Sequence, residues 1–327
     1  MSDALVRLSL AIGDYDHVRD LVAGAVRADG IDLAATVLPA PELFARFTRT
    51  REWDVAEMSL GMYVAMLSRG DTSLTALPVF PSRMFRHGAI FVRRGGGIDA
   101  PADLAGRRIG FPDWTHTAGI WARALLAHEY GVPLDGIAWV QAGLDRPGFV
   151  ARPGSELPAN LRHEPVQERD LDTMLREGAI DAIISAHTPP GARGDDPQIV
   201  RLLPDRAVEE EYYLRTRIFP IMHVVCVRRD ALAAAPAAAA SLFAAFSEAR
   251  ARSITRLRDT MVSHFPLPWM AAEAARARSL FGDDIWPYGV GANRATLTAF
   301  LRYAREQGVA ARDVALEELF PDTVLST

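Results

Sequence analysis

Short apolar runs alternate with segments of helical periodicity in the first part of the chain, as they do in βαβ folds. The predicted strands cover residues 5–12, 31–37 and 54–57, and the predicted helices cover residues 17–26, 42–47 and 59–67. Open α/β sheets bind ligands beyond the carboxyl ends of their strands. The residues at those ends are Asp14, Tyr15, Asp16, Glu57, Met58 and Ser59. The pattern therefore places a first group of candidate site residues at one sheet edge.

A second α/β unit is predicted further along the chain. Its strands cover residues 109–111, 137–140 and 180–185, and its helices cover residues 118–128 and 171–176. Thr115 or Thr117 is suited to cap the first of these helices, because a threonine oxygen accepts hydrogen bonds from the first helical N–H groups. The positive end of the helix dipole would then face a bound carboxylate. His116 lies in the same loop, and His187 follows the last predicted strand.

Two histidines stand at the start of matched apolar runs. His87 precedes the run 88–93, and His223 precedes the run 224–228. Both runs contain β-branched residues and lead into paired arginines. Two such runs, far apart in sequence, predict strands that cross between two lobes. Each histidine would then face the cleft between the lobes.

These crossings predict an α/β protein with two lobes. Lobe 1 is discontinuous and is predicted to contain residues 1–93 and 225–327, while lobe 2 contains residues 94–224. From residue 236 onward apolar residues recur at helical spacing, so lobe 1 is expected to end in a mainly helical segment. An aromatic loop at 282–293 separates two of those helices. Lobes of this kind close on a ligand by hinge motion.

Composition narrows the classes of function. With 49% apolar and 24% charged residues among 327, the chain has the make-up of a globular protein with packed cores. A net charge of −5 without a basic block argues against nucleic acid as a partner. No apolar stretch reaches the roughly 18–20 residues of a membrane helix. Residues 1–7 lack the basic and apolar regions of a secretory signal, so we expect a cytoplasmic protein with no membrane partner.

Two absences remove further chemistry. Cys226 is the only cysteine, which excludes disulfides within the chain and thiolate metal clusters. All 36 basic residues are arginine, which excludes a lysine Schiff base, a pyridoxal enzyme and a P-loop. No organic cofactor is expected. Glu57, His87, His187 and His223 are acceptable metal ligands, but no local spacing indicates a site, so a divalent metal stays a secondary expectation.

Histidine is then the residue best suited to move a proton. Imidazole titrates near neutral pH, so either His87 or His223 could act as acid or base. Glu57 could serve as a base or orient a hydroxyl group. The alternative for Glu57 is a charge near a helix N-terminus, which the helix dipole favours. His116 and His187 are further candidates from loops of lobe 2.

Positive charge and aromatic rings are available for an aromatic anion. Arg83 and Arg86 come shortly before His87, and a planar guanidinium can bind a carboxylate bidentately. Trp286 and Tyr288 could stack on an aromatic ring, although loop aromatics also anchor loops to a core. Together these features indicate a site for a small anionic ligand.

Five motifs taken together resemble one known family. They are Gly13-Asp14-Tyr15-Asp16, DVAEMSL at 54–60, PVFPSRMFRHGAIFV at 78–92, YYLRTRIFPIMHVV at 212–225 and WPYGVGANR at 286–294. Nearly end to end, the chain resembles the 4,5-dihydroxyphthalate decarboxylase family. Members of that family have the type II periplasmic-binding-protein fold, so the resemblance implies the same two-lobed α/β architecture. The chain departs from the usual pattern of the family at 114–117, in a loop that would contact the substrate.

The resemblance implies a decarboxylase that removes CO2 from a hydroxylated aromatic, phthalate-type acid. Direct loss of CO2 would leave an unstable aryl anion, whereas protonation of the ring carbon gives an intermediate that a para hydroxyl stabilises. Under this hypothesis His87 or His223 donates the proton, and Glu57 or the other histidine polarises the phenol. The predicted substrate-binding residues are Arg83, Arg86, Ser59, Tyr15, Asp16, Thr115, His116, Thr117, His187, Trp286 and Tyr288.

Two other functions stay open at the level of the sequence. A solute-binding protein could capture a small aromatic or other carboxylate in the same cleft without catalysis. Against this, two histidines and an acid are more ionisable groups than passive capture needs. A different lyase or hydrolase could also use this fold, since the loop at 114–117 is unusual. The expected partner is a small aromatic carboxylate, and a homo-oligomer is left open.

Overall fold

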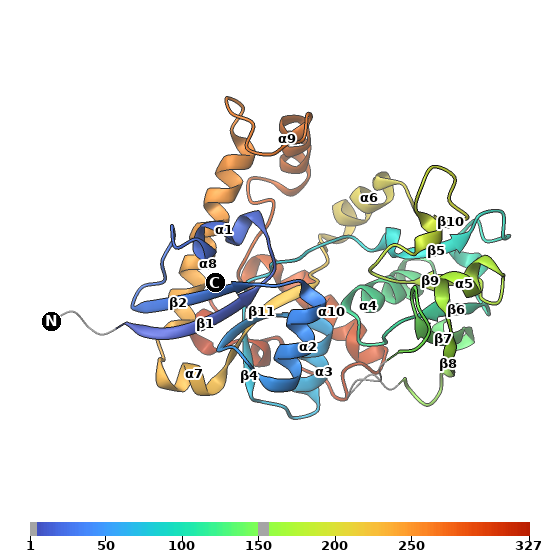
Figure 1. Ribbon diagram of the computed structural model, residues 1–327, viewed down its shortest axis with the longest axis horizontal. Helices are drawn as coiled ribbons and strands as arrows, with labels where there is room; N and C mark the ends of the chain where they lie inside the picture. The colour runs from blue at the N-terminus through green and yellow to red at the C-terminus, as the bar shows by residue number, and fades with distance from the viewer. Residues whose placement is uncertain (1–4, 150–156) are drawn as a thin grey trace.

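Two β-sheets flanked by helices organise the computed structural model, which describes residues 5–149 and 157–327. Figure 1 shows the sheets side by side along the long axis of the molecule. Residues 1–4, on which part of the signal-sequence argument rests, and residues 150–156 lie outside the described residues. The two-lobed α/β architecture predicted from the sequence is confirmed.

The first sheet has the strand order β2-β1-β3-β11-β4. Its strands are β1 (Val6–Ile12), β2 (Ile31–Val37), β3 (Val55–Ser59), β4 (Leu74–Leu77) and β11 (His223–Arg228). Strand β1 is parallel to β2 and β3, whereas β11 runs antiparallel to β3 and β4. All five residues of the central strand β3 are buried. The strand therefore carries its one acidic residue, Glu57, into the interior of the lobe.

The second sheet has the order β10-β5-β9-β6-β7-β8. Its strands are β5 (Ile90–Arg93), β6 (Arg108–Phe111), β7 (Ala138–Gly143), β8 (Arg162–Asp170), β9 (Ala182–Ile184) and β10 (Ile199–Arg201). Strand β6 is parallel to β7 and β9, and β5 is antiparallel to β9 and β10. The edge strand β8 is largely exposed and polar. An edge strand needs no continuous apolar face, so the apolar pattern of the sequence does not predict it.

Ten α-helices pack around the sheets in the described part of the chain. They are α1 (Asp16–Val22), α2 (Ala40–Thr50), α3 (Leu60–Ser68), α4 (Thr117–Ala124), α5 (Leu171–Arg176), α6 (Arg206–Thr216), α7 (Arg229–Ala234), α8 (Ala238–Arg258), α9 (Met270–Phe281) and α10 (Arg294–Glu306). Helix α4 contacts both α3 and α10, so these three helices join the two lobes. In Figure 1 the end of α8 and the following α9 project at the top of the molecule.

The chain passes between the sheets twice, and the two passages run antiparallel where Arg83 pairs with Ile221. The first passage leads from β4 into the second sheet, and the second leads back to β11 in the first sheet. The run 88–93, predicted as part of lobe 1, therefore belongs to the second sheet. His87 precedes β5 of the second sheet and His223 begins β11 of the first sheet, because the chain travels in opposite directions at the two places. The matched runs are not themselves the crossings, which corrects the expectation from the sequence.

One large apolar core extends across both lobes. It includes Trp121 of α4, whose ring lies 5.4 Å from that of Phe300 in α10, between ring centres. The indole N–H of Trp121 donates to the carbonyl oxygen of Ile221, over 3.0 Å, in the second passage. A second, smaller cluster around Phe91 and Leu175 belongs to the second sheet and α5. Packing through α4 therefore holds the lobes together.

Gly61, in the first turn of α3, permits a close approach to the loop before α4. A Cβ at this position would clash with the carbonyl oxygen of Thr115 and would lie 2.8 Å from Ile120 Cδ1. Gly61→Ala is therefore expected to lower the free energy of unfolding by about 1–3 kcal/mol. Thermal denaturation measures the change. Gly136→Ala is the matched control, since a Cβ there meets nothing closer than 3.8 Å, and equal stability of the two variants would contradict the close packing.

Candidate active site

Three polar side chains of the first lobe meet at one edge of its sheet. Tyr15 follows β1, Glu57 lies in β3, and His223 opens β11. In the antiparallel register His223 pairs with Ser59 and Val225 pairs with Glu57. His223 and Glu57 are therefore diagonal neighbours on one face of the sheet. Because β1 and β3 are parallel, the segment after β1 brings Tyr15 to the same edge.

The carboxylate of Glu57 has three hydrogen-bond partners. The Tyr15 hydroxyl donates to Oε1 over 2.7 Å, the Gly13 N–H donates to Oε2 over 2.8 Å, and His223 Nδ1 lies 2.6 Å from Oε1. Gly13 permits this arrangement, since a Cβ there would lie 2.6 Å from Tyr15 Cε2. The side chain of Glu57 is fully buried. Its hydrogen bonds therefore replace the water that it loses on folding.

These contacts determine the charge states of Glu57 and Tyr15. Burial alone would raise the pKa of the Glu57 carboxyl, but His223, Tyr15 and Gly13 together hold that pKa below its usual range. Burial, followed by the negative charge of Glu57, raises the pKa of the Tyr15 phenol. At neutral pH Glu57 is therefore an anion, and Tyr15 is a neutral hydrogen-bond donor.

His223 connects this buried acid to the surface, because its side chain is 20% exposed. An ionised carboxylate accepts the bond at Nδ1, so Nδ1 carries a proton and Nε2 is left for a ligand. Phe44 of α2 packs edge-on to the imidazole, with 4.8 Å between ring centres. The ring is thus held from two sides. A partly exposed imidazole whose Nδ1 is bonded to a buried carboxylate can donate a proton from Nε2.

The lowered pKa of Glu57 predicts a pH-dependent contribution to stability. This contribution is complete above the pKa of an unfolded glutamate, about 4.3, and is lost as the pH falls toward the lower pKa of the folded state. Urea unfolding of the wild type and Glu57→Gln between pH 7 and pH 3 measures it. We expect a difference in unfolding free energy that shrinks below pH 4.3. Glu317→Gln, at an exposed position, controls for general loss of a carboxylate, and a difference independent of pH would contradict the prediction.

The start of α4, from the second lobe, lies against Ser59 and Gly61, at the junction of β3 and α3. Thr117 Oγ1 lies 2.8 Å from Ser59 Oγ and accepts a hydrogen bond from Gly61 N–H over 2.9 Å. The hydroxyl of Thr115 is bonded within its own loop. Neither threonine caps α4, which corrects the prediction: the N-cap is His116, and its side chain makes no capping bond. The His116 side chain therefore does not satisfy the first N–H groups of α4.

Two histidines of the second lobe lie near each other, with 6.4 Å between the ring centres of His116 and His187. His116 follows β6, and the exposed His187 follows β9. These strands are parallel neighbours, so the loops at their carboxyl ends lie together. The carboxyl ends of parallel strands lie at one edge of a sheet, which brings Tyr15 and Glu57 together in the first lobe and His116 and His187 together in the second.

The two arginines expected to hold an anion have different surroundings. Arg83 is buried, and its guanidinium donates to two backbone carbonyl oxygens and to Asn293 Oδ1. Arg86 is 9% exposed and donates from Nε to Met222 Sδ over 3.0 Å, next to His223 in the chain. Burial lowers the pKa of Arg86 to about 10, so the group stays charged at neutral pH. In the described part of the chain no carboxylate forms an ion pair with Arg86, although the charge of Glu209 on α6 acts on it at longer range.

The structure does not bring His87 to Glu57 and His223. The ring of His87 packs against Tyr212 of α6, with 5.2 Å between ring centres, and Nδ1 lies 4.0 Å from Glu209 Oε1. The residue is only 1% exposed, and burial lowers its pKa to about 4. His87 is therefore neutral and enclosed at neutral pH, a poor state for a proton donor.

Three other predicted residues, Asp16, Trp286 and Tyr288, are held within the protein. Asp16 accepts hydrogen bonds from α8, and the Trp286 indole donates to a backbone carbonyl oxygen over 3.0 Å. Tyr288 is buried. The sequence pattern did not predict His17, whose ring centre lies 5.3 Å from that of Tyr15 and 5.5 Å from that of Trp286. Its only signal is its place directly after the Gly13–Asp16 motif, and burial lowers its pKa to about 4.

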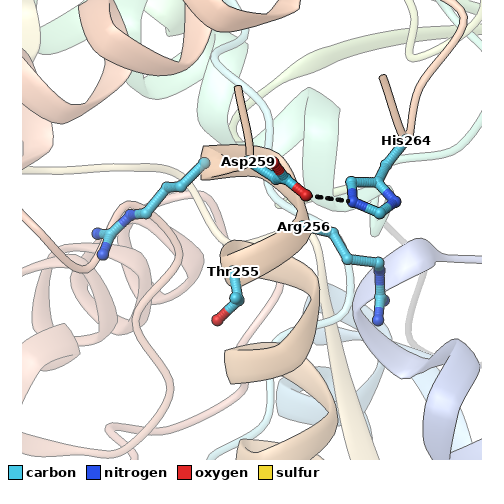
Figure 2. A pocket seen from close by; sticks show the side chains of 5 residues that line it. Thr255, Arg256, Asp259 and His264 are labelled. Carbon is cyan, nitrogen blue, oxygen red and sulfur yellow. Dashed lines mark hydrogen bonds and ion pairs between the residues drawn. The ribbon is translucent and has the colours of Figure 1, made fainter. Parts of the chain in front are cut away.

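A separate hollow of about 490 Å³ lies at the end of α8 (Figure 2). It is lined by Thr255, Arg256, Arg258, Asp259 and His264. His264 Nε2 lies 2.9 Å from Asp259 Oδ2 in this hollow. None of these residues was predicted as part of the site, and none contacts Glu57 or His223.

Within residues 5–149 and 157–327, no group of three or more His, Cys, Asp or Glu side chains is arranged to hold a metal ion. The same residues contain no helix that is long and apolar enough to span a membrane.

Known proteins match this chain over nearly its whole length. A 4,5-dihydroxyphthalate decarboxylase of Comamonas testosteroni is 36% identical over 317 residues, which are 96% of this chain and 96% of that protein. The chain belongs to the 4,5-dihydroxyphthalate decarboxylase family. A protein of the same name from Pseudomonas putida is 35% identical over 201 residues, 61% of this chain and 78% of its own. This is a family of carboxy-lyases. The motifs predicted that this chain belongs to it, and the prediction is confirmed. No protein-family profile matches the chain.

Solved structures share the fold of this decarboxylase family at much lower identity. The periplasmic aliphatic sulphonate-binding protein SsuA of Escherichia coli superposes with a TM-score of 0.54 at 15% identity, over 97% of this chain and 92% of that one. The match confirms the periplasmic-binding-protein-like fold. At this identity it carries nothing about the ligand.

Proposed function

We propose that the protein is a non-oxidative decarboxylase of a hydroxylated aromatic dicarboxylate, with His223 as the proton donor and 4,5-dihydroxyphthalate as the first candidate substrate. Family membership supports the class of reaction. The observation that carries the assignment of His223 is its Nδ1 contact with the buried carboxylate of Glu57. With Nδ1 bonded to Glu57, Nε2 is the nitrogen of this partly exposed imidazole that is available to a ligand.

The reaction requires a proton at the ring carbon that carries the departing carboxylate. His223 donates this proton from Nε2 while the hydroxyl para to that carbon loses its proton and releases electron density into the ring. The bond to the carboxylate then breaks, CO2 leaves, and the bonding electron pair restores the aromatic ring. The phenol regains its proton, and solvent reprotonates His223. From 4,5-dihydroxyphthalate the products are CO2 and 3,4-dihydroxybenzoate.

Glu57 acts on His223 in this mechanism and not on the phenol. Both oxygens of its carboxylate are already bonded within the protein. A buried carboxylate at Nδ1 orients the ring and stabilises the imidazolium form that donates the proton. The pair His116 and His187, in the other lobe, is then assigned to the phenol.

Arg86 is assigned to the carboxylate that stays on the ring, because it is a charged, largely buried guanidinium without an ion-pair partner among the described residues. Arg86→Gln is therefore expected to raise KM about 10- to 100-fold, the loss of one charge-assisted contact. The turnover number should change much less, since the group does not move a proton. Steady-state kinetics separate the two constants. A fall in kcat at constant KM would contradict this role.

The proposal is tested by incubating the protein with 4,5-dihydroxyphthalate or phthalate. We expect one CO2 and one 3,4-dihydroxybenzoate for each 4,5-dihydroxyphthalate consumed. Phthalate should not react, because it lacks the para hydroxyl that stabilises the protonated ring. Binding of 4,5-dihydroxyphthalate without CO2 release would support a solute-binding protein instead. Equal turnover of phthalate would contradict the proposed mechanism.

A further inference from the structure

A cavity of about 230 Å³ lies beside the two passages between the lobes. Arg83 of the first passage and Phe219 of the second line it, together with Tyr213 and Arg217 at the end of α6. Residues between 281 and 296 complete the wall. Its lining therefore comes from both passages.

The cavity carries an excess of positive charge. Arg83 donates only to neutral oxygens, and in the described part of the chain no carboxylate lies within ion-pair distance of it. Its Nε is buried without a hydrogen-bond partner. Arg217 is exposed at the rim, while the acid of the lining, Asp284, is bonded to Arg250 at 2.6 and 2.7 Å. The charge of Asp284 acts on Arg83 although no ion pair joins them. A buried guanidinium without a directly bonded counter-charge is costly, so the cavity favours an anionic ligand.

Aromatic rings form the other part of the wall. The rings of Phe219 and Phe281 lie 5.0 Å apart, and those of Tyr213 and Phe281 lie 4.3 Å apart, between centres. The Arg83 guanidinium lies over the Phe219 ring at 5.1 Å. A flat ring beside these side chains would gain stacking contacts, and a negative group on it would meet the guanidinium.

We propose that this cavity is a second binding site, for a single-ring aromatic carboxylate. The carboxylate supplies the missing counter-charge of Arg83 and Arg217, and the ring packs against Phe219 and Phe281. The volume is below the roughly 300–1,000 Å³ of drug-sized ligand pockets, which restricts the ligand to one ring.

This site is distinct from the one at Glu57. Arg83 lines the cavity, and the lining includes none of Tyr15, Glu57 and His223. A ligand in the cavity contacts both passages and ties them together.

Calorimetric titration with benzoate, compared with benzamide, tests the proposal without reference to turnover. Ala292 lines the cavity and is exposed, so Ala292→Phe should fill the cavity and keep the fold. The matched control is Ala295→Phe. Ala295 lies in α10, three residues after Ala292, and is exposed outside the cavity lining. Arg217→Asn removes the rim charge and keeps a residue that tolerates the positive φ of 58°.

We expect benzoate to bind the wild type, Ala295→Phe and His223→Gln with equal affinity and to bind Ala292→Phe and Arg217→Asn at least tenfold more weakly. Benzamide, which has the ring without the charge, should not bind. Absence of benzoate binding, equal affinity for Ala292→Phe, loss of binding only in His223→Gln, or equal binding of benzamide would each overturn the proposal. Since no outcome depends on CO2 release, failure here and failure of the decarboxylase proposal are distinguishable.

Discussion

Replacement of His223 by glutamine is expected to lower kcat for CO2 release from 4,5-dihydroxyphthalate by about 10²- to 10⁴-fold. Glutamine can still donate a hydrogen bond to Glu57, so the buried carboxylate keeps a partner. It has no proton that can be transferred to a ring carbon at neutral pH. Steady-state kinetics measure the loss, and calorimetric binding of the substrate shows that the variant still forms the complex.

The matched control is the same substitution at His87, the other histidine that stands before an apolar run in the sequence. His87→Gln is expected to keep kcat within about threefold of the wild type, because His87 is enclosed beside α6 and makes no contact with Glu57. Thermal denaturation of both variants establishes that each is folded. A large loss in His87→Gln together with normal turnover in His223→Gln would reverse the assignment of the proton donor.

Replacement of Glu57 by glutamine is expected to lower kcat by about 10²- to 10⁴-fold with little change in KM, as when the carboxylate behind a catalytic imidazole is neutralised. An amide cannot stabilise the imidazolium by its charge. Its NH2 group would also face the N–H of Gly13 or the hydroxyl of Tyr15, both of which donate to Glu57. The kcat and KM of the purified variant check the prediction.

Tyr15→Phe is a milder change to the same site than Glu57→Gln, and the losses in kcat of the two variants are compared. It removes one hydrogen bond from the carboxylate and keeps the charge. Its loss in kcat should therefore be smaller than that of Glu57→Gln. Equal losses in the two variants would show that the hydrogen-bond network, and not the charge of Glu57, supports His223.

Most of the first sheet and its site edge could be predicted from the sequence, because apolar residues recur along β1, β2, β3 and β11. The four-residue strand β4 was not predicted. The strand at 31–37 was predicted with the bounds that the structure gives to β2. Strands that are polar or short leave no such pattern: β8 is an exposed edge, and β10 has three residues. The same logic brought Tyr15 and Glu57 to one edge, since parallel strands end together.

The parts of the site that could not be predicted depend on long-range topology. His87 and His223 begin similar runs, but the direction of each passage places those runs in different sheets. Arg83 and Arg86 are three residues apart, yet their roles separate because Arg83 bonds to Asn293, 210 residues away. Contacts of this kind leave no local signal in the sequence.

A single-turnover experiment tests the central claim most directly. Protein in excess over 4,5-dihydroxyphthalate binds all of the substrate, and acid quenching after a fixed time reports its fate. The account predicts that the wild type converts the bound substrate completely to CO2 and 3,4-dihydroxybenzoate, while His223→Gln binds it and returns it intact over the same interval. Intact substrate recovered from the wild type, or complete conversion by His223→Gln at the wild-type rate, would contradict the account.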